Sequence, residues 1–444
     1  MSLLRQVTVA TSLLSGVVFL SGKPRVHFVE PLALLIGGTT EVTIHGDSLR
    51  DGDQAPSIWT NFDSEWIVLQ DEKSNPRKVR FQVSLPPSST SGAGVIRVWT
   101  PKGTSVPFVI LKDRFPDSVT FRFKDNAPVI HNFNVKLGQM FSCEVWGNRL
   151  NQKVDPVMSL RDPNGKFIQQ VDDDPVNGAD PMLVFKAEAD GEHELSVHDL
   201  HWSGGPFGVL RARELSSQEK TTAKGVHHTT TEPKKFPIAV KKGEFLTIKP
   251  QTQSLGSPAM LLMELKESGR QLSKSGRGDV LDEPLRYKAS NDAECELFIY
   301  DLLGREGLPF TFEISRETAP FTVQQRGNDC HNLAPGQELK LDFRVVRFNY
   351  NGPISIHCED LEAIGKAEIP EKKNDTKLSF RVPECADPET LLVIRFFARA
   401  EVNGRTYEEN VRTDEQLNKT PRHFLDWPAG VSGSNFVTVL KGKG

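Results

Sequence analysis

The feature that most constrains the fold of this chain is a duplication. Two stretches repeat one another imperfectly at an offset of about one hundred residues. The matching segments are VKLG at 135–138 with VKKG at 240–243, FKA at 185–187 with YKA at 287–289, and ELSVHDL at 194–200 with ELFIYDL at 296–302. The copies share alternating apolar residues and turn formers, which build strands and turns. The sequence therefore predicts one folding unit that occurs twice.

The fold class follows from periodicity. A chain of 444 residues is too long for one core, and usual domain sizes predict three or four domains. Helical spacing is hard to find after the N-terminal segment, whereas short alternating runs recur, with hairpin signals such as Asn164-Gly165 and Asp190-Gly191. We predict an all-β protein of tandem antiparallel β-sandwiches, immunoglobulin-like and jelly-roll-like, arranged like beads on a string.

Composition shifts along the chain indicate the domain boundaries. The segment 215–231 is polar and unlike either neighbour, as expected of a linker. In the last part, Leu339, Leu341 and Phe343 alternate with charged residues, and this pattern predicts another sandwich. The predicted units are a signal segment (1–22), an immunoglobulin-like domain (23–113), the first copy (114–214), the linker (215–231), the second copy (232–316) and a C-terminal immunoglobulin-like sandwich (317–444).

The N-terminal segment has the layout of a secretory signal. Arg5 precedes an apolar stretch over 7–20, and small residues follow at Ser21 and Gly22. The stretch is too short to span a bilayer stably, and no later run is apolar enough to do so. A weak N-terminal strand or an uncleaved anchor are the alternatives. We expect export to the periplasm, the cell surface or the medium.

Five cysteines are compatible with export. Their odd number leaves at least one thiol unpaired. Cys143 is answered by Ile248 in the second copy, which marks it as a small core residue. One pair among Cys330, Cys358 and Cys385 could form a disulfide in the last domain. The absence of a Cys-x-x-Cys spacing argues against a zinc or redox site.

Two segments resemble known families. Residues 37–49, GGTTEVTIHGDSL, follow Glu30-Pro31 and resemble the opening strands of the IPT/TIG immunoglobulin-like domain. The first copy resembles the bacterial pre-peptidase C-terminal (PPC) domain, a β-sandwich of exported proteins, through VKLGQ at 135–139, DPNG at 162–165, DDD at 172–174 and ADGEHEL at 189–195. The domain order is similar to that of large exported β-proteins of planctomycete-type bacteria. The first copy departs from the PPC pattern between Asp117 and Phe133, where the usual acidic opening is missing.

An acidic run is the candidate metal site. Asp172, Asp173 and Asp174, with Asp180, could supply the oxygen ligands that calcium prefers. The alternative is a solvated turn, because the chain has no Asp-x-Asp-x-Asp-Gly frame with a following Glu. Calcium is the one cofactor that the sequence raises.

A loop that holds a tryptophan is the candidate ligand site. His198, His201 and Trp202 lie beyond a strand end, where an aromatic face could stack on a sugar or a peptide. The alternative is a tryptophan packed over the end of the sandwich. The remaining tryptophans in strand-like contexts are expected in cores: Trp59, Trp66, Trp99 and Trp146.

Two shorter motifs are weaker indications of function. Arg277-Gly278-Asp279 spells an adhesion tripeptide, but loop chemistry alone explains its glycine and aspartate. His227-His228 in the linker lacks the preorganisation that a transition-metal site needs.

Two classes of function remain open. A formal net charge of −4 provides no basic field for nucleic acid, and the usual hydrolase, metalloprotease and nucleotide-binding motifs are absent. We expect a non-enzymatic, exported binding or scaffolding protein whose partner is a protein, a polysaccharide or a cell-envelope component. The alternative is an accessory part or relic of a secreted peptidase or hydrolase system.

Overall fold

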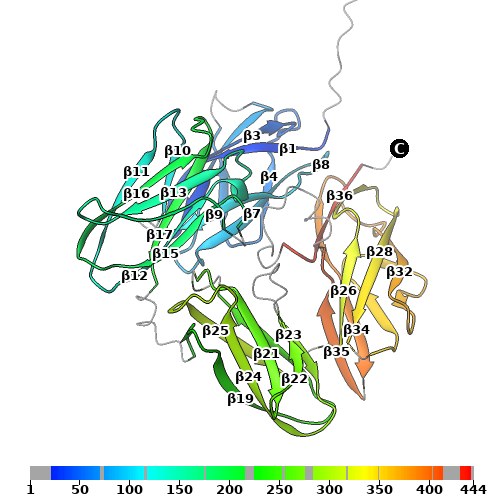
Figure 1. Ribbon diagram of the computed structural model, residues 1–444. Helices are drawn as coiled ribbons and strands as arrows, with labels where there is room; N and C mark the ends of the chain where they lie inside the picture. Colours follow the sequence, from blue (N-terminus) through cyan, green and yellow to red (C-terminus); the bar gives the residue numbers. More distant parts are fainter. Residues whose placement is uncertain are drawn as a thin grey trace, which may run out of the picture.

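The computed structural model describes most of the chain as β-strands joined by turns (Figure 1). Within the described residues there is no α-helix, and the one helical element is the 3-10 turn η1 (Asn148–Leu150). The predicted all-β class of tandem β-sandwiches is confirmed. The described residues are 22–70, 75–114, 118–174, 177–215, 225–252, 255, 257–275, 284–316, 319–348, 350–402, 404–413 and 431–441. Residues 1–21 of the expected signal and the tripeptide at 277–279 lie outside them.

The N-terminal unit, which we call module 1, spans 22–114. Its two sheets have the orders β1-β3-β6-β5 and β2-β9-β7-β4, with β8 beside β7, and β2 runs parallel to β9. Alternation in β3 turns Val42 and Ile44 into the core between the sheets. The strands are β1 (Arg25–Glu30), β2 (Ala33–Leu35), β3 (Thr39–Asp47), β4 (Ser57–Thr60), β5 (Glu65–Val68), β6 (Lys78–Ser84), β7 (Gly92–Thr100), β8 (Gly103–Thr104) and β9 (Phe108–Asp113).

Modules 2 (118–215) and 3 (225–316) have the same topology. Module 2 pairs its strands as β10-β17-β12-β15 and β11-β16-β13-β14, and module 3 repeats both orders as β18-β25-β20-β23 and β19-β24-β21-β22. Module 2 consists of β10 (Ser118–Arg122), β11 (Val129–Val135), β12 (Met140–Trp146), β13 (Pro156–Arg161), β14 (Phe167–Val171), β15 (Met182–Lys186), β16 (Gly191–Asp199) and β17 (Phe207–Glu214). Module 3 consists of β18 (His227–His228), β19 (Lys234–Val240), β20 (Phe245–Gln251), β21 (Leu261–Glu267), β22 (Arg270–Lys274), β23 (Leu285–Lys288), β24 (Ala293–Asp301) and β25 (Pro309–Ser315).

The register of the pairs is repeated as well. Phe141 lies opposite Phe185 in module 2, and Leu246 lies opposite Tyr287 in module 3. Cys143 and its counterpart Ile248 are both fully buried, as the sequence comparison predicts for a core position. The repeated segments therefore build equivalent strands, residue by residue.

Module 4 (319–441) is the C-terminal sandwich. Its sheets have the orders β26-β28-β32-β30, β27-β36-β33 and β31-β29-β34-β35. The strands are β26 (Phe321–Arg326), β27 (Cys330–Leu333), β28 (Glu338–Arg347), β29 (Ile354–His357), β30 (Glu362–Ile364), β31 (Glu368–Ile369), β32 (Asp375–Arg381), β33 (Leu391–Arg395), β34 (Phe397–Val402), β35 (Arg405–Asn410) and β36 (Ser434–Val439). All five cysteines are free, so the disulfide considered among Cys330, Cys358 and Cys385 does not form in this structure.

The expected linker at 215–231 is wrong at both ends. Leu215 belongs to the hydrophobic core of module 3. His227 and His228 form β18, which pairs with β25 as the edge strand of its sheet. The ring of His227 also packs on Phe236 and Phe310, at centroid distances of 4.7 and 5.6 Å. Local composition is polar here, but pairing with a strand some eighty residues away fixes the conformation.

Each module contacts the next one along the chain, and module 4 also contacts module 1. Module 2 meets module 3 where Met140 and Val184 pack against the module 3 core. Module 3 meets module 4 where Phe245 contacts Tyr407 edge-on, with ring centroids 6.2 Å apart. Module 4 contacts module 1 through a buried ion pair, Arg97 Nη2 to Asp329 Oδ2 at 2.5 Å. Figure 1 shows β36 of module 4 next to β8 of module 1.

Candidate functional site

The loop after β16 is shaped by one carboxylate. Asp199 Oδ1 accepts a hydrogen bond from the Asp155 backbone N–H (3.0 Å), and Oδ2 accepts from those of His201 (3.1 Å) and Ser203 (3.2 Å). Burial tends to raise the pKa of Asp199, but the bonds from Asp155, Ser203 and His201 outweigh it and hold the pKa below its ordinary value. The carboxylate is therefore a structural anchor of the loop.

The loop holds Trp202 in an unusual conformation. Its φ of 58° lies in the left-handed region, which a bulky residue seldom occupies. The Trp202 backbone N–H donates to the Asp199 carbonyl at 2.7 Å, so the turn is closed at this residue. The residue is 41% exposed. Strained backbone that presents an aromatic ring to solvent is typical of sites where function, rather than packing, selects the residue.

The ring of His198 packs against that of Trp202. The two ring centroids lie 3.8 Å apart at an interplanar angle of 53°. Burial lowers the pKa of His198, so its imidazole is neutral near pH 7. His201 is exposed, and only its backbone joins the Asp199 anchor. The structure therefore brings His198 and Trp202 into contact and places His201 on the rim of the same loop.

The acidic run lies at the same end of module 2. Burial raises the pKa of Asp155, and the nearby negative charges of Asp173, Asp199 and Asp172 raise it further. The first two aspartates of the run, Asp172 and Asp173, are exposed. Asp155 is therefore the member of this acidic group that sequence reasoning missed, although its place directly before Pro156, which the second copy repeats as Pro258, could have marked it.

The predicted calcium set does not assemble. Asp180 is fully buried, and its carboxylate accepts from the backbone N–H groups of Gly147 (2.9 Å) and Asn148 (2.7 Å) and from Arg149 Nε (2.9 Å). These bonds occupy its lone pairs, whereas Asp172 and Asp173 are exposed. Across the described part of the chain, no three His, Cys, Asp or Glu side chains form a group that could hold a metal.

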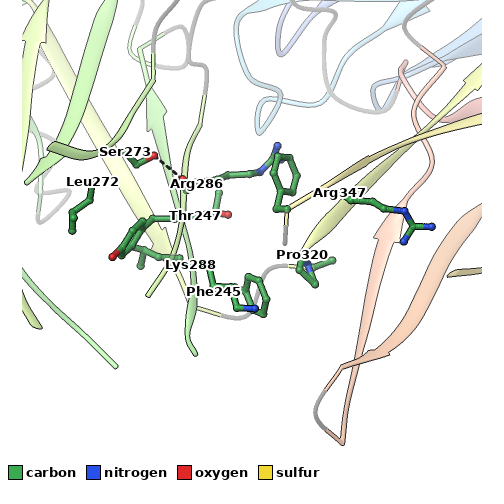
Figure 2. Close-up of a pocket in the computed structure, with 12 residues that line it drawn as sticks. Phe245, Thr247, Leu272, Ser273, Arg286, Lys288, Pro320 and Arg347 are labelled. Carbon is green, nitrogen blue, oxygen red and sulfur yellow. Dashed lines mark hydrogen bonds between the residues drawn. The ribbon is translucent and has the colours of Figure 1, made fainter. Parts of the chain in front are cut away.

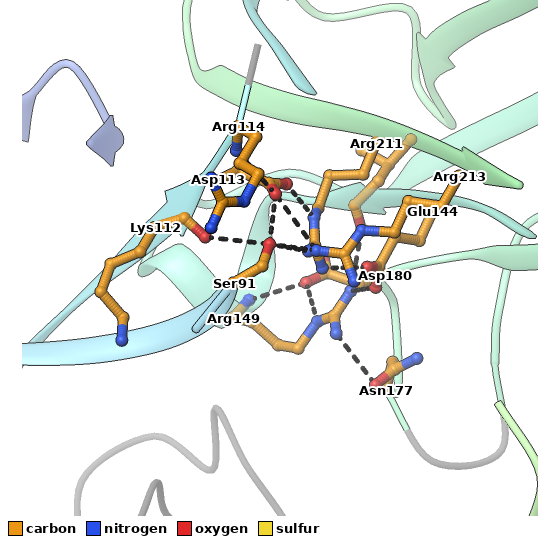
Figure 3. Close-up of polar contacts among 11 residues, drawn as sticks. Ser91, Lys112, Asp113, Arg114, Glu144, Arg149, Asn177, Asp180, Arg211 and Arg213 are labelled. Atoms are coloured by element: carbon orange, nitrogen blue, oxygen red, sulfur yellow. Dashed lines mark hydrogen bonds and ion pairs between the residues drawn. The ribbon is translucent and has the colours of Figure 1, made fainter. Parts of the chain in front are cut away.

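Arg149 and Asp180 belong to a buried network between modules 1 and 2 (Figure 3). Arg211 donates to Asp113 of module 1 (Nε to Oδ2, 2.6 Å) and to Glu144 (2.5 Å), and all three side chains are buried. Arg149 also donates to Glu144, at 3.2 Å. Fully paired buried charges of this kind fix one arrangement of their surroundings, because separating them leaves a charge without a partner.

The expected core tryptophans lie mostly at module boundaries. Trp146 is buried in module 2 but packs with the module 1 core, beneath Arg149 (3.9 Å from the guanidinium carbon to the ring centroid). Trp99 donates from Nε1 to Thr438 Oγ1 of module 4 at 3.2 Å. Trp59 contacts Phe436 of the same module, with ring centroids 4.8 Å apart. These rings hold modules together, and among the tryptophans of the described residues Trp202 is the exposed one.

A pocket of about 410 Å³ lies between modules 3 and 4 (Figure 2). Sequence reasoning missed it because its two walls are far apart in the chain. The module 3 wall presents cations and aromatic rings, and the module 4 wall comes from β28 and the segment before β26. The lining residues that matter below are Phe245, Thr247, Ser273, Arg286, Tyr287, Lys288, Arg347 and Phe348.

Comparisons with known proteins leave the family open. No family model and no curated protein matches the chain. Among solved structures, the D1–D4 ectodomain fragment of ICAM-5 is 12% identical, with a TM-score of 0.16 over 86% of this chain and 96% of that one. The M60 catalytic domain with two CBM51 domains from Clostridium perfringens ZmpB is 8% identical, with a TM-score of 0.19 over 65% of this chain and 43% of that one. Tripeptidyl peptidase 2 is 9% identical, with a TM-score of 0.15 over 93% and 39%. TM-scores this low do not establish a shared fold.

One further observation concerns membranes. In the described residues we find no helix with the length and hydrophobicity that crossing a bilayer requires.

Proposed function

We propose that the chain is a non-catalytic, exported binding protein that recognises a polysaccharide through the end of module 2. The observation that carries the proposal is the exposed ring of Trp202, held in left-handed backbone by Asp199 and backed by His198. A rigid aromatic face binds the apolar face of a sugar with little loss of side-chain entropy. The resemblance of modules 1 and 2 to IPT/TIG and PPC domains of exported proteins is part of the same proposal.

The acids beside Trp202 indicate what kind of sugar fits. Asp155 and Asp173 place carboxylate oxygens near the loop, where they can accept hydrogen bonds from sugar hydroxyl groups. The same negative charges repel an anionic ligand. The expected partner is a neutral or amino-sugar polysaccharide.

The test compares a binding variant with a matched control. Binding of the purified chain to a glycan array is expected to disappear in Trp202→Gly, which puts into module 2 the residue that module 3 uses at the same place. Trp59→Phe serves as a control that alters a ring at a module boundary. Binding that survives Trp202→Gly would contradict the proposed site. Labelling of a single serine by a serine-hydrolase probe would contradict the non-catalytic assignment.

A further inference from the structure

The two junctions that follow the repeated modules use the same face. In module 2, Met140 and Val184 contact the next module, and the equivalent residues of module 3, Phe245 and Arg286, lie at its contact with module 4. The equivalence is fixed by register, since Ser142 pairs with Val184 and Thr247 pairs with Arg286. The first junction is apolar and close-packed: a Cβ built on Gly307 would lie only 2.9 Å from Met140 Cε. The second junction has replaced valine by arginine and contains the pocket.

The walls of the pocket combine cations with aromatic faces. The Arg286 guanidinium lies 4.9 Å from the Phe348 ring centroid, and Lys288 Nζ lies 5.0 Å from that of Phe245. Figure 2 shows Arg286 extending from module 3 across the junction toward module 4. Both cations come from β23 in the module 3 wall, and each is held at an aromatic ring, Arg286 at one of module 4 and Lys288 at one of module 3, in a geometry that favours them electrostatically.

Only one of the lining cations has spare charge for a ligand. Arg347 donates to the carbonyls of Gly352 (2.7 Å) and Pro370 (3.1 Å), and Figure 2 shows its guanidinium pointing away from the pocket. Glu409 offsets Arg286: burial raises the Glu409 pKa, and the charge of Arg286 acts against that rise. Lys288 forms no ion pair with any described residue, and its amino group has three donors.

We propose that this pocket binds a carboxylated sugar, with the carboxylate on Lys288 and the ring against the aromatic walls. The volume of about 410 Å³ suits one or two sugar rings. Thr247 and Ser273 add hydroxyl groups at the pocket wall, and Ser273 Oγ donates to the Arg286 carbonyl at 2.7 Å, which leaves its lone pairs for a ligand hydroxyl. The pocket is separate from the Trp202 loop and is lined by cations, whereas acids surround that loop. It therefore binds a ligand different from the one proposed for Trp202.

Calorimetric titration of the full chain with glucuronate tests the proposal. Glucuronate is expected to bind, with glucose and inorganic phosphate binding at least about ten-fold more weakly, because each supplies only half of the recognised chemistry. Lys288→Met is expected to weaken glucuronate binding about ten-fold or more, while Lys288→Arg retains most of it. Lys186→Met, the same change at the equivalent position of module 2, is expected to leave it within about two-fold.

Several results would overturn it. They are the absence of glucuronate binding, equal weakening by Lys186→Met and Lys288→Met, or phosphate binding as tight as glucuronate binding. Thermal unfolding of each variant separates lost binding from lost folding, and Lys288→Arg provides a second reading if the methionine variant unfolds. Glucuronate binding is expected to persist in Trp202→Gly, so failure at one site is distinguishable from failure at the other.

Discussion

Modules 2 and 3 form a natural comparison, because the same strands carry different neighbours. In module 2 the cross-strand pair Glu144 and Arg211 is buried against Asp113 of module 1. The equivalent pair in module 3, Lys249 and Glu313, has the charges reversed and faces solvent. Sheet geometry alone places the two charged residues opposite one another. How much the pair contributes to stability depends on whether a neighbouring module buries it.

The same contrast applies at the loop and at the junction. Trp202 and Gly304 occupy one left-handed position, with φ of 58° and 68°, in turns closed by the same bond from the backbone N–H to the Asp199 or Asp301 carbonyl. Module 3 has glycine at this position, which adopts a positive φ without a steric cost, whereas module 2 has tryptophan, which does not. Duplication therefore preserved the anchors and changed the surfaces, which is where we place both proposed ligands.

The largest expected effect comes from breaking the buried network. Glu144→Ala leaves Arg211 and Arg149 with an unbalanced buried charge, and this is expected to lower the free energy of unfolding by about 3–5 kcal/mol. Urea unfolding measures it. Glu313→Ala, the corresponding member of the exposed pair, is expected to change stability by less than about 0.5 kcal/mol. Equal effects of the two changes would show that coverage by module 1 does not matter.

Acid is expected to loosen module 2 before module 3. Burial tends to raise the pKa of Glu144, but Arg211 and Arg149 outweigh it and hold the pKa below the ordinary 4.5. A carboxylate with a lowered pKa in the folded state stabilises above its unfolded value and loses that contribution as the pH falls through the folded value. The stability of the wild type is therefore expected to fall below about pH 4.5, by up to about 1.4 kcal/mol per pH unit for this group.

Urea midpoints between pH 7 and pH 3 check this dependence. Glu144→Gln removes the titrating group and is expected to flatten the curve, whereas Glu313→Gln is expected to leave its slope unchanged. An unchanged slope in Glu144→Gln would mean that other carboxylates govern acid unfolding.

The shared anchors are expected to matter equally in both modules. Asp199 accepts from two backbone N–H groups of the loop that follows it, and Asp301 Oδ2 accepts from the Arg305 backbone N–H of the corresponding loop at 3.0 Å. Asp301 Oδ1 also accepts from the Met260 backbone N–H at 2.7 Å. Replacing either by alanine leaves partly buried N–H groups unpaired, which costs about 1–3 kcal/mol. Hydrogen exchange of the two loops is the measurement. A large loss in one module alone would contradict their equivalence.

The sequence predicts what is local and repeated. Alternation and turn residues were sufficient for the strands of both copies, and the turn at Asn164-Gly165 forms with Gly165 N–H bonded to Asp162. The same reasoning identified Trp202 as a loop tryptophan beside histidines beyond a strand end, whereas its equivalence to Gly304 became visible only in the structure.

The sequence does not predict contacts between modules. Arg97 and Asp329 are separated by more than two hundred residues, and neither lies in a pattern that indicates the other. Asp180 fits an acidic metal ligand by type, but Arg149 and the backbone of η1 decide its role. The pocket at Lys288 depends on two surfaces that meet only in the folded chain. These are tertiary properties, for which no local periodicity exists.

The smallest expected effect concerns the left-handed position itself. Gly304→Ala places a Cβ at φ of 68° and is expected to cost about 1 kcal/mol. Trp202→Gly relieves the same strain but loses the contact with His198 and gains unfolded-state entropy, so the terms oppose one another and the net change is expected to stay within about 1 kcal/mol. Thermal unfolding of both variants tests the pair. A loss well above that range in Trp202→Gly would mean that Trp202 is a packing residue, and the reason for placing a ligand on its ring would disappear.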